Sequence, residues 1–115
     1  MLKDLLLKNA ANAMHQWIDE QGLTVESLQQ QLNANAPILD QALGSIPKER
    51  VGTARVMARP FLKNLTEADY AKVLTYLWEF PSSRNHALLI HKQYFHSHWV
   101  PAMKKLQQWL LTGSP

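Results

Sequence analysis

The sequence predicts an all-α protein, a compact bundle of five to six short helices in a single domain spanning residues 1–115. Apolar residues recur at helical spacing, and no stretch shows the strict alternation typical of a half-buried strand. Glycine, proline and threonine stand where helices begin and end. With 46% hydrophobic and 18% charged residues, the chain has the composition of a folded domain, and 115 residues suffice for one core.

The first predicted helix covers residues 2–21 and ends at Gly22, a residue suited to the left-handed position after a helix. At about 100° per residue its leucines, alanines, Met14 and Trp17 share one side. The opposite side is polar and includes His15, so the pattern predicts an amphipathic helix with this side in water.

Two shorter helices follow in the predicted order. Thr24 is placed to cap a helix over residues 24–34, because its hydroxyl can accept hydrogen bonds from the first-turn amides. A loop at residues 33–37 then leads to a short apolar helix that ends at Gly44.

A basic helix is predicted from Pro47 to about Asn64. Proline suits the first turn of a helix, where its missing N–H is not needed. Pro60 lies inside the predicted helix, where a proline removes a backbone hydrogen bond, so we expect a bend or break close to it.

The next helix is predicted to begin after Thr66, with Asp69 at the third position completing a capping pattern, and to end before Pro81. Its expected core face consists of Tyr70, Val73, Leu74, Leu77 and Trp78.

The last segment is predicted to be helical from about Arg84 to Leu111, with a bend or split at Pro101. Gly113 is expected to end it, leaving residues 112–115 as a loose tail. Its expected apolar face consists of Phe95, Trp99, Ala102, Met103, Leu106, Trp109 and Leu110.

Positive charge concentrates in the basic helix. Residues 46–65 carry five basic side chains against one acidic side chain, whereas the whole chain has a net charge of only +3. On an ideal helix four of these cations fall within about 80° of one another, beside the apolar arc. Such a strip suits a nucleic-acid backbone or another polyanion, which it would bind without reading sequence. The strip consists of Lys48, Arg55, Arg59 and Lys63.

The same strip has a structural interpretation. Long basic side chains commonly cover the edge of a core while their charged ends stay in water. Acidic residues of the first two helices are also available to pair with them. A functional strip therefore requires cations that are exposed and not neutralised within the chain.

Four histidines between residues 86 and 98 raise the question of a metal site. Zinc ligands on one helix usually stand three or four residues apart, and none of these pairs does. We therefore expect no metal, with His91 and His98 at the edge of the apolar face and His86 and His96 towards solvent.

No pattern of an enzyme active site is visible. The chain has no cysteine, its four glycines form no phosphate-binding loop, and its serines follow no nucleophile-elbow pattern. We expect no catalytic residue and no cofactor. The apolar run near the N-terminus is too short and too interrupted for a signal peptide, and no stretch is long enough to span a membrane, so we expect a cytoplasmic protein.

Aromatic residues suggest a second contact surface. Tyr76 and Phe80 lie one turn apart on a second apolar edge of the helix that follows Thr66. Tyrosine and other large aromatic side chains often anchor protein interfaces, although a central helix in a bundle would also be apolar on two sides.

The functional hypothesis is a non-catalytic interaction or assembly module that contacts a nucleic-acid backbone through its basic helix and docks a protein neighbour through its aromatic edge. Small helical subunits of nucleoprotein complexes have this size, fold class and basic face, which is an analogy at the level of fold. The alternative is a protein-binding adaptor or regulator with no nucleic-acid role.

Overall fold

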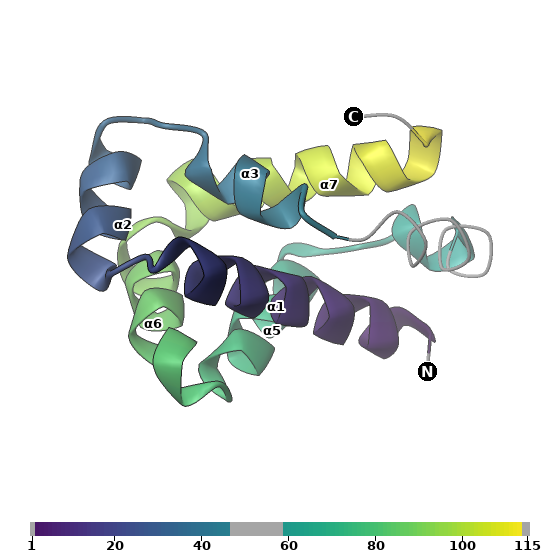
Figure 1. Ribbon diagram of the computed structural model, residues 1–115. Helices are drawn as coiled ribbons and strands as arrows, with labels where there is room; N and C mark the ends of the chain where they lie inside the picture. Colours follow the sequence, from purple (N-terminus) through teal and green to yellow (C-terminus); the bar gives the residue numbers. More distant parts are fainter. Residues whose placement is uncertain (1, 47–58, 114–115) are drawn as a thin grey trace.

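All regular structure in the computed structural model, which describes residues 2–46 and 59–113, is helical (Figure 1). The predicted all-α fold is confirmed. A helical turn at residues 59–62 precedes α5. The named elements are α1 (Leu2–Gln21), α2 (Val25–Asn33), α3 (Ile38–Leu43), α5 (Glu67–Trp78), the 3₁₀ turn η1 (Pro81–Ser83), α6 (Arg84–Gln93), the π-helical turn η2 (Phe95–Trp99) and α7 (Val100–Thr112).

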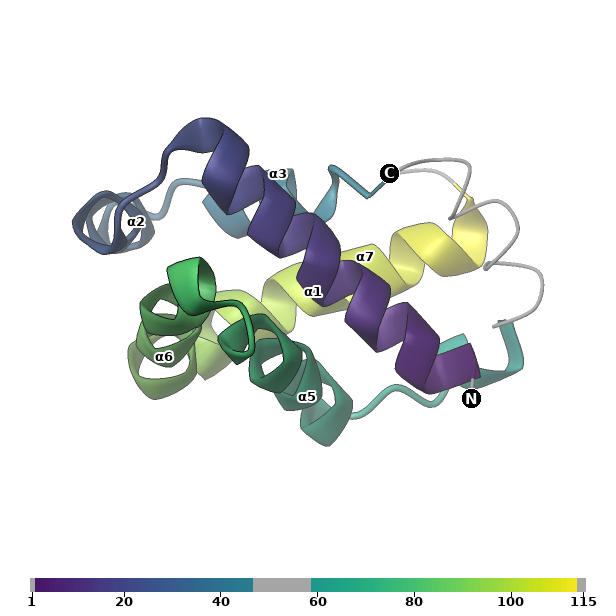
Figure 2. The ribbon, with the colours of Figure 1, turned by 60° about the horizontal axis from the view of Figure 1, so that its bottom comes forward.

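Helix α1 lies at the centre of the arrangement. It packs against α5 on one side and against α3 on the other, while α7 packs on α3 and α6 packs on α5 (Figures 1 and 2). The short helix α2 closes one end of the molecule, and the start of α1 and the end of α7 lie at the opposite end.

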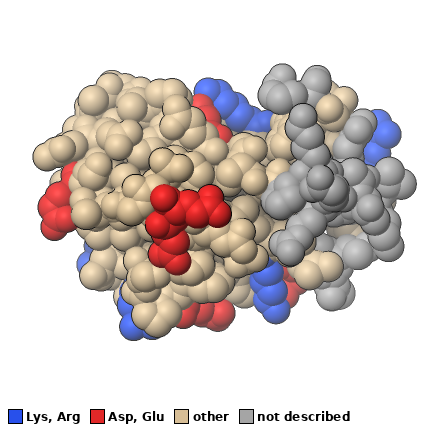
Figure 3. Space-filling model, viewed as in Figure 1, with Lys and Arg blue, Asp and Glu red and all other residues tan. Residues whose placement is uncertain are grey.

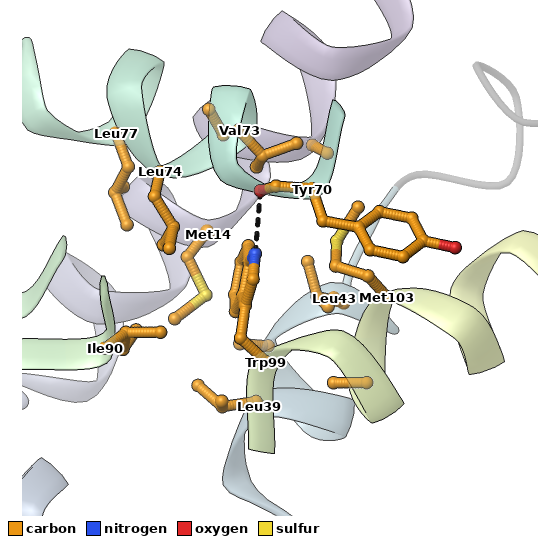
Figure 4. Close-up of a cluster of buried hydrophobic side chains, with 14 of the residues drawn as sticks. Met14, Leu39, Leu43, Tyr70, Val73, Leu74, Leu77, Ile90, Trp99 and Met103 are labelled. Atoms are coloured by element: carbon orange, nitrogen blue, oxygen red, sulfur yellow. Dashed lines mark hydrogen bonds between the residues drawn. The ribbon is translucent and has the colours of Figure 1, made fainter. Parts of the chain in front are cut away.

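Trp99 is the largest side chain in the core and has no exposed surface. Its indole Nε1 donates a hydrogen bond of 2.8 Å to the backbone carbonyl of Tyr70, which satisfies the one polar atom of the ring. Figure 4 shows Met14, Leu39 and Ile90 around this tryptophan. The side chains come from α1, α3 and α6, so one residue joins several helices.

Local capping interactions set several of the helix ends, as predicted. Gly22 and Gly113 adopt left-handed conformations, with φ of 57° and 81°, directly after α1 and α7. Thr24 caps α2 through its side chain. Thr66 and Asp69 form a complete capping box at the start of α5.

The helix predicted from Arg84 to Leu111 is interrupted, but not at Pro101, where the bend was expected. The regular helix stops at Tyr94, whose backbone leaves the helical region with φ of −128° and ψ of 16°. The chain then forms η2, in which the Trp99 N–H reaches back to the Tyr94 carbonyl. Pro101 lies in the first turn of α7, where a missing N–H has no cost.

The predicted helix over residues 47–64 lies mostly outside the described residues. Residues 59–62 are helical and 63–64 form a turn, which agrees with the predicted end. The expected bend near Pro60 falls at the boundary of the described part and stays a prediction. At the other end of the chain, Thr112 belongs to α7 rather than to the predicted tail.

The prediction that the polar side of α1 faces water holds for Lys8 and Asp19, which are exposed, but not for Asp4 and His15, which are half-buried. Part of this side packs against α5, where Asp4 accepts a hydrogen bond from the hydroxyl of Tyr76 and lies 3.1 Å from the Lys72 ammonium. Lys3 lies 2.9 Å from Asp69 of the α5 capping box. Polar contacts thus join two helices that are far apart in the chain.

The contacts of Asp4 and Asp69 between α1 and α5, called the polar seam below, predict that the protein loses stability in acid. The pKa of Asp4 is lowered to about 2 by the hydrogen bond from Tyr76 and by Lys72. Burial opposes ionisation of Asp69, but hydrogen bonds from Thr66 and Lys3 outweigh it and lower its pKa. A carboxyl whose pKa is lower in the folded state stabilises the fold above its unfolded value of 3.8, and this contribution disappears as the pH falls.

We therefore expect the midpoint of urea unfolding to decrease as the pH falls from about 5 towards about 2, the range set by these two carboxyls. The double variant Asp4→Asn/Asp69→Asn is expected to flatten this dependence. Unfolding of the wild-type protein that does not change over this pH range would contradict the role of the seam.

Two side chains occupy environments opposite to those predicted. Trp78, assigned to the core face of α5, is 38% exposed, and the Arg84 guanidinium lies 5.4 Å from its ring centre. His86, assigned to solvent, is buried and its Nε2 lies 2.7 Å from the backbone carbonyl of Leu23. The prediction treated residues 84–111 as one helix. Because the helix is interrupted at Tyr94 and α2 packs on α6, a different side of α6 faces inward from the side predicted.

Candidate functional site

Half of the predicted basic strip lies in the described part of the chain. Arg59 and Lys63 are both exposed, at the helical turn that precedes α5, and Lys48 and Arg55 lie outside the described residues. The turn is held in place because Leu62 is fully buried and its carbonyl accepts a hydrogen bond from the Gln107 side chain of α7.

Arg59 and Lys63 have no acidic partner in the described ranges, and neither have Arg84 and Lys92 of α6. Lys104, one turn before Gln107 on α7, is also exposed and without an acidic partner in these ranges. The lysines that are neutralised by aspartates are Lys3, Lys8, Lys72 and Lys105.

In Figure 3 the described residues of the face seen in Figure 1 form no single field of positive charge. Acidic side chains gather near its centre and the basic ones lie at its edges.

The predicted aromatic edge is in contact with α1. The ring of Phe80 stacks on His15, with centroids 4.0 Å apart and planes 8° from parallel. Tyr76 bonds to Asp4, and the ammonium groups of Lys8 and Lys72 lie 5.4 and 5.7 Å from its ring centre. Both rings are half-buried, so only part of each is available to a protein partner.

The histidines do not come together. Within the described ranges no group of three or more histidine, cysteine or acidic side chains is arranged to hold a metal ion. His91 and His96 are exposed, and His98 is half-buried and bonded to Ser97 and Asn35. The Nδ1 atom of buried His86 has no hydrogen-bond partner among the residues that the structure describes.

One serine–histidine–aspartate chain was not visible in the sequence. His15 Nδ1 lies 2.7 Å from Ser83 Oγ, and its Nε2 lies 3.3 Å from an Asp19 oxygen. The order of groups resembles that of a catalytic triad. Ser83, however, has no exposed surface, so a substrate cannot reach its hydroxyl. The chain of contacts joins α1 to η1.

A second polar chain lies at the surface. His98 Nδ1 lies 2.7 Å from Ser97 Oγ, and its Nε2 lies 3.2 Å from Asn35 Oδ1. All three line a pocket of about 230 Å³ beside Lys105. Acyl transfer also needs donors aimed at the developing oxyanion. The ammonium of Lys105 is already held 2.9 Å from Asp40, and the described contacts of this pocket give no second donor.

A mostly apolar hollow forms a groove between α3 and α7. Its volume is about 470 Å³, which is within the range of ligand and peptide sites. Leu43, Leu106 and half-buried Trp109 line it, and the Asp40–Lys105 ion pair stands at its rim. The sequence places Trp109 on an apolar face but gives no sign of the groove, because the groove depends on how α3 and α7 pack.

These features define an all-α protein with exposed cations at one end and open grooves between helix pairs. The chain matches no protein-family model, no curated protein sequence and no solved structure. In the described ranges no helix combines the length and the apolar character needed to span a bilayer.

Proposed function

We propose that this protein is an interaction module that contacts a nucleic-acid backbone through its basic strip, of which Arg59 and Lys63 are the described part. The observation that supports this most strongly is that both side chains are exposed and lack an acidic partner in the described ranges, whereas four lysines elsewhere are paired with aspartates. A paired lysine has already lost part of its attraction for phosphate.

The chemistry of the strip favours binding without sequence selectivity. Lysine and arginine contacts to phosphate release condensed counterions, which provides affinity but carries no information about the bases. The anchoring of Leu62 in the core and on α7 would let the cations contact phosphates without a large ordering cost.

Variants with both charges removed test this proposal. The change Arg59→Gln/Lys63→Gln is expected to weaken binding to a labelled random-sequence oligonucleotide about tenfold at low salt, because two phosphate contacts are lost. Fluorescence anisotropy with the full chain measures the affinity.

The matched control removes two cations that are already neutralised by Asp4, in the variant Lys8→Gln/Lys72→Gln. It is expected to change the affinity less than threefold. Equal losses in the two double variants would indicate a response to net charge alone, and the proposed location of the site would be wrong.

The groove between α3 and α7 supports a second candidate, a protein-binding adaptor. Trp109 and its leucine neighbours offer an apolar floor, and tryptophan is a frequent anchor of protein interfaces. An adaptor that uses this groove would keep its partner when Arg59 and Lys63 are replaced and would lose it on the change Trp109→Ala.

A further inference from the structure

The α5–α6 pair lies on the opposite side of the molecule from α3 (Figures 1 and 2). A second open groove is lined by residues of these two helices. It consists of two adjoining hollows of about 290 and 580 Å³ that share His91. One hollow is bordered by Trp78 and Leu88, and the other by Phe95. Apolar side chains therefore line this surface at both of its ends.

The exposure of Trp78 is notable because the rest of α5 buries its large apolar side chains. Trp78 is one of only three large apolar residues that are clearly exposed in the described ranges, together with Leu5 and Phe61. Of these three, only Trp78 borders one of the two hollows of this groove.

The two helices carry opposite charges at the ends of the groove. Helix α6 contains Arg84 and Lys92 and no acidic residue. Helix α5 has Glu67 at its start and Glu79 directly after its end. Glu67 and Lys92 both line the hollow at one end of the groove, where Glu67 also lies 3.8 Å from His96. At the other end Glu79 follows Trp78 in the chain, and the Arg84 guanidinium lies 5.4 Å from the Trp78 ring.

The charges at the two ends of this groove are complementary to the same charges on a second copy of the chain. A twofold axis in the plane of contact and parallel to the two helices places α5 of one copy on α6 of the other. Glu67 then approaches Lys92 of the second copy, and Glu79 approaches Arg84 of the second copy. An axis perpendicular to the helices would instead oppose glutamate to glutamate and cation to cation, which costs binding energy.

We propose that the outer face of α5 and α6 is a homodimer interface, in which two helix pairs form a four-helix bundle with Trp78 covered by Leu88 of the second copy. The inference does not depend on Arg59 and Lys63, which lie on a different part of the chain. Each helix has only about three turns, so the face is small and a reversible dimer is expected.

Sedimentation equilibrium of the full chain, from low to high micromolar concentration, tests the dimer. The wild-type protein is expected to pass from monomer to dimer. Both Glu67→Lys and Lys92→Glu are expected to weaken self-association at least tenfold, because each makes two contacts repulsive. The double variant Glu67→Lys/Lys92→Glu is expected to restore association to within about threefold of the wild type.

A mixing experiment separates specific pairing from a change in net charge. An equimolar mixture of the Glu67→Lys and Lys92→Glu variants is expected to form heterodimers, although each variant alone is monomeric. Lys104→Glu, an exposed change on α7, is the control and is expected to leave dimerisation unchanged. A monomeric wild-type protein, or a double variant that stays as weak as the single ones, overturns the proposal.

Discussion

Replacing Trp99 by alanine is expected to lower the free energy of unfolding by about 3–5 kcal/mol, the usual cost of emptying a large buried aromatic site. The side chain has no exposed surface and joins α5, through its bond to the Tyr70 carbonyl, to the start of α7. Urea unfolding followed by circular dichroism measures the change.

Trp99→Phe is the informative companion variant. It keeps most of the apolar volume but removes the Nε1–H donor, so a loss of about 1–3 kcal/mol is expected. A loss below about 1 kcal/mol for Trp99→Ala would mean that this residue does not lie at the centre of the core.

Replacing Leu74 by alanine is expected to cost about 2–4 kcal/mol, because only 3% of this residue is exposed on the inner side of α5. The chain offers a matched control in Leu5, which is 55% exposed on α1. The same change there is expected to cost less than about 0.5 kcal/mol, since surface substitutions away from special features have small effects. Similar losses at the two positions would invalidate the assignment of the α5 core face.

The helix limits could be predicted because their causes are local. A threonine that caps, as Thr24 and Thr66 do, acts on backbone amides within three residues. A glycine such as Gly22 or Gly113 ends a helix through its own backbone conformation. These signals are complete in short stretches of sequence, and the structure places the ends where they indicate.

The errors arose where a distant segment decides the outcome. Part of the polar side of α1 meets α5, whose Tyr76 and Lys72 are about seventy residues away in the chain. The buried position of His86 depends on a carbonyl at Leu23. Helical periodicity predicts on which side of a helix a residue lies, but not which other element packs against that side.

The candidate site was only partly predictable for the same reason. The exposure of Arg59 and Lys63 follows from their place beside the apolar arc, as the periodicity predicts. The lack of acidic partners in the described ranges, the two serine–histidine chains and the grooves result from tertiary packing, which no spacing in the sequence encodes.

The salt dependence of binding to random-sequence nucleic acid tests the proposed function most directly. For wild-type protein the logarithm of the association constant is expected to fall against the logarithm of salt concentration with a slope of about −2 or steeper, since at least Arg59 and Lys63 contact phosphates. No binding at low salt, or binding that salt does not weaken, would contradict the proposal.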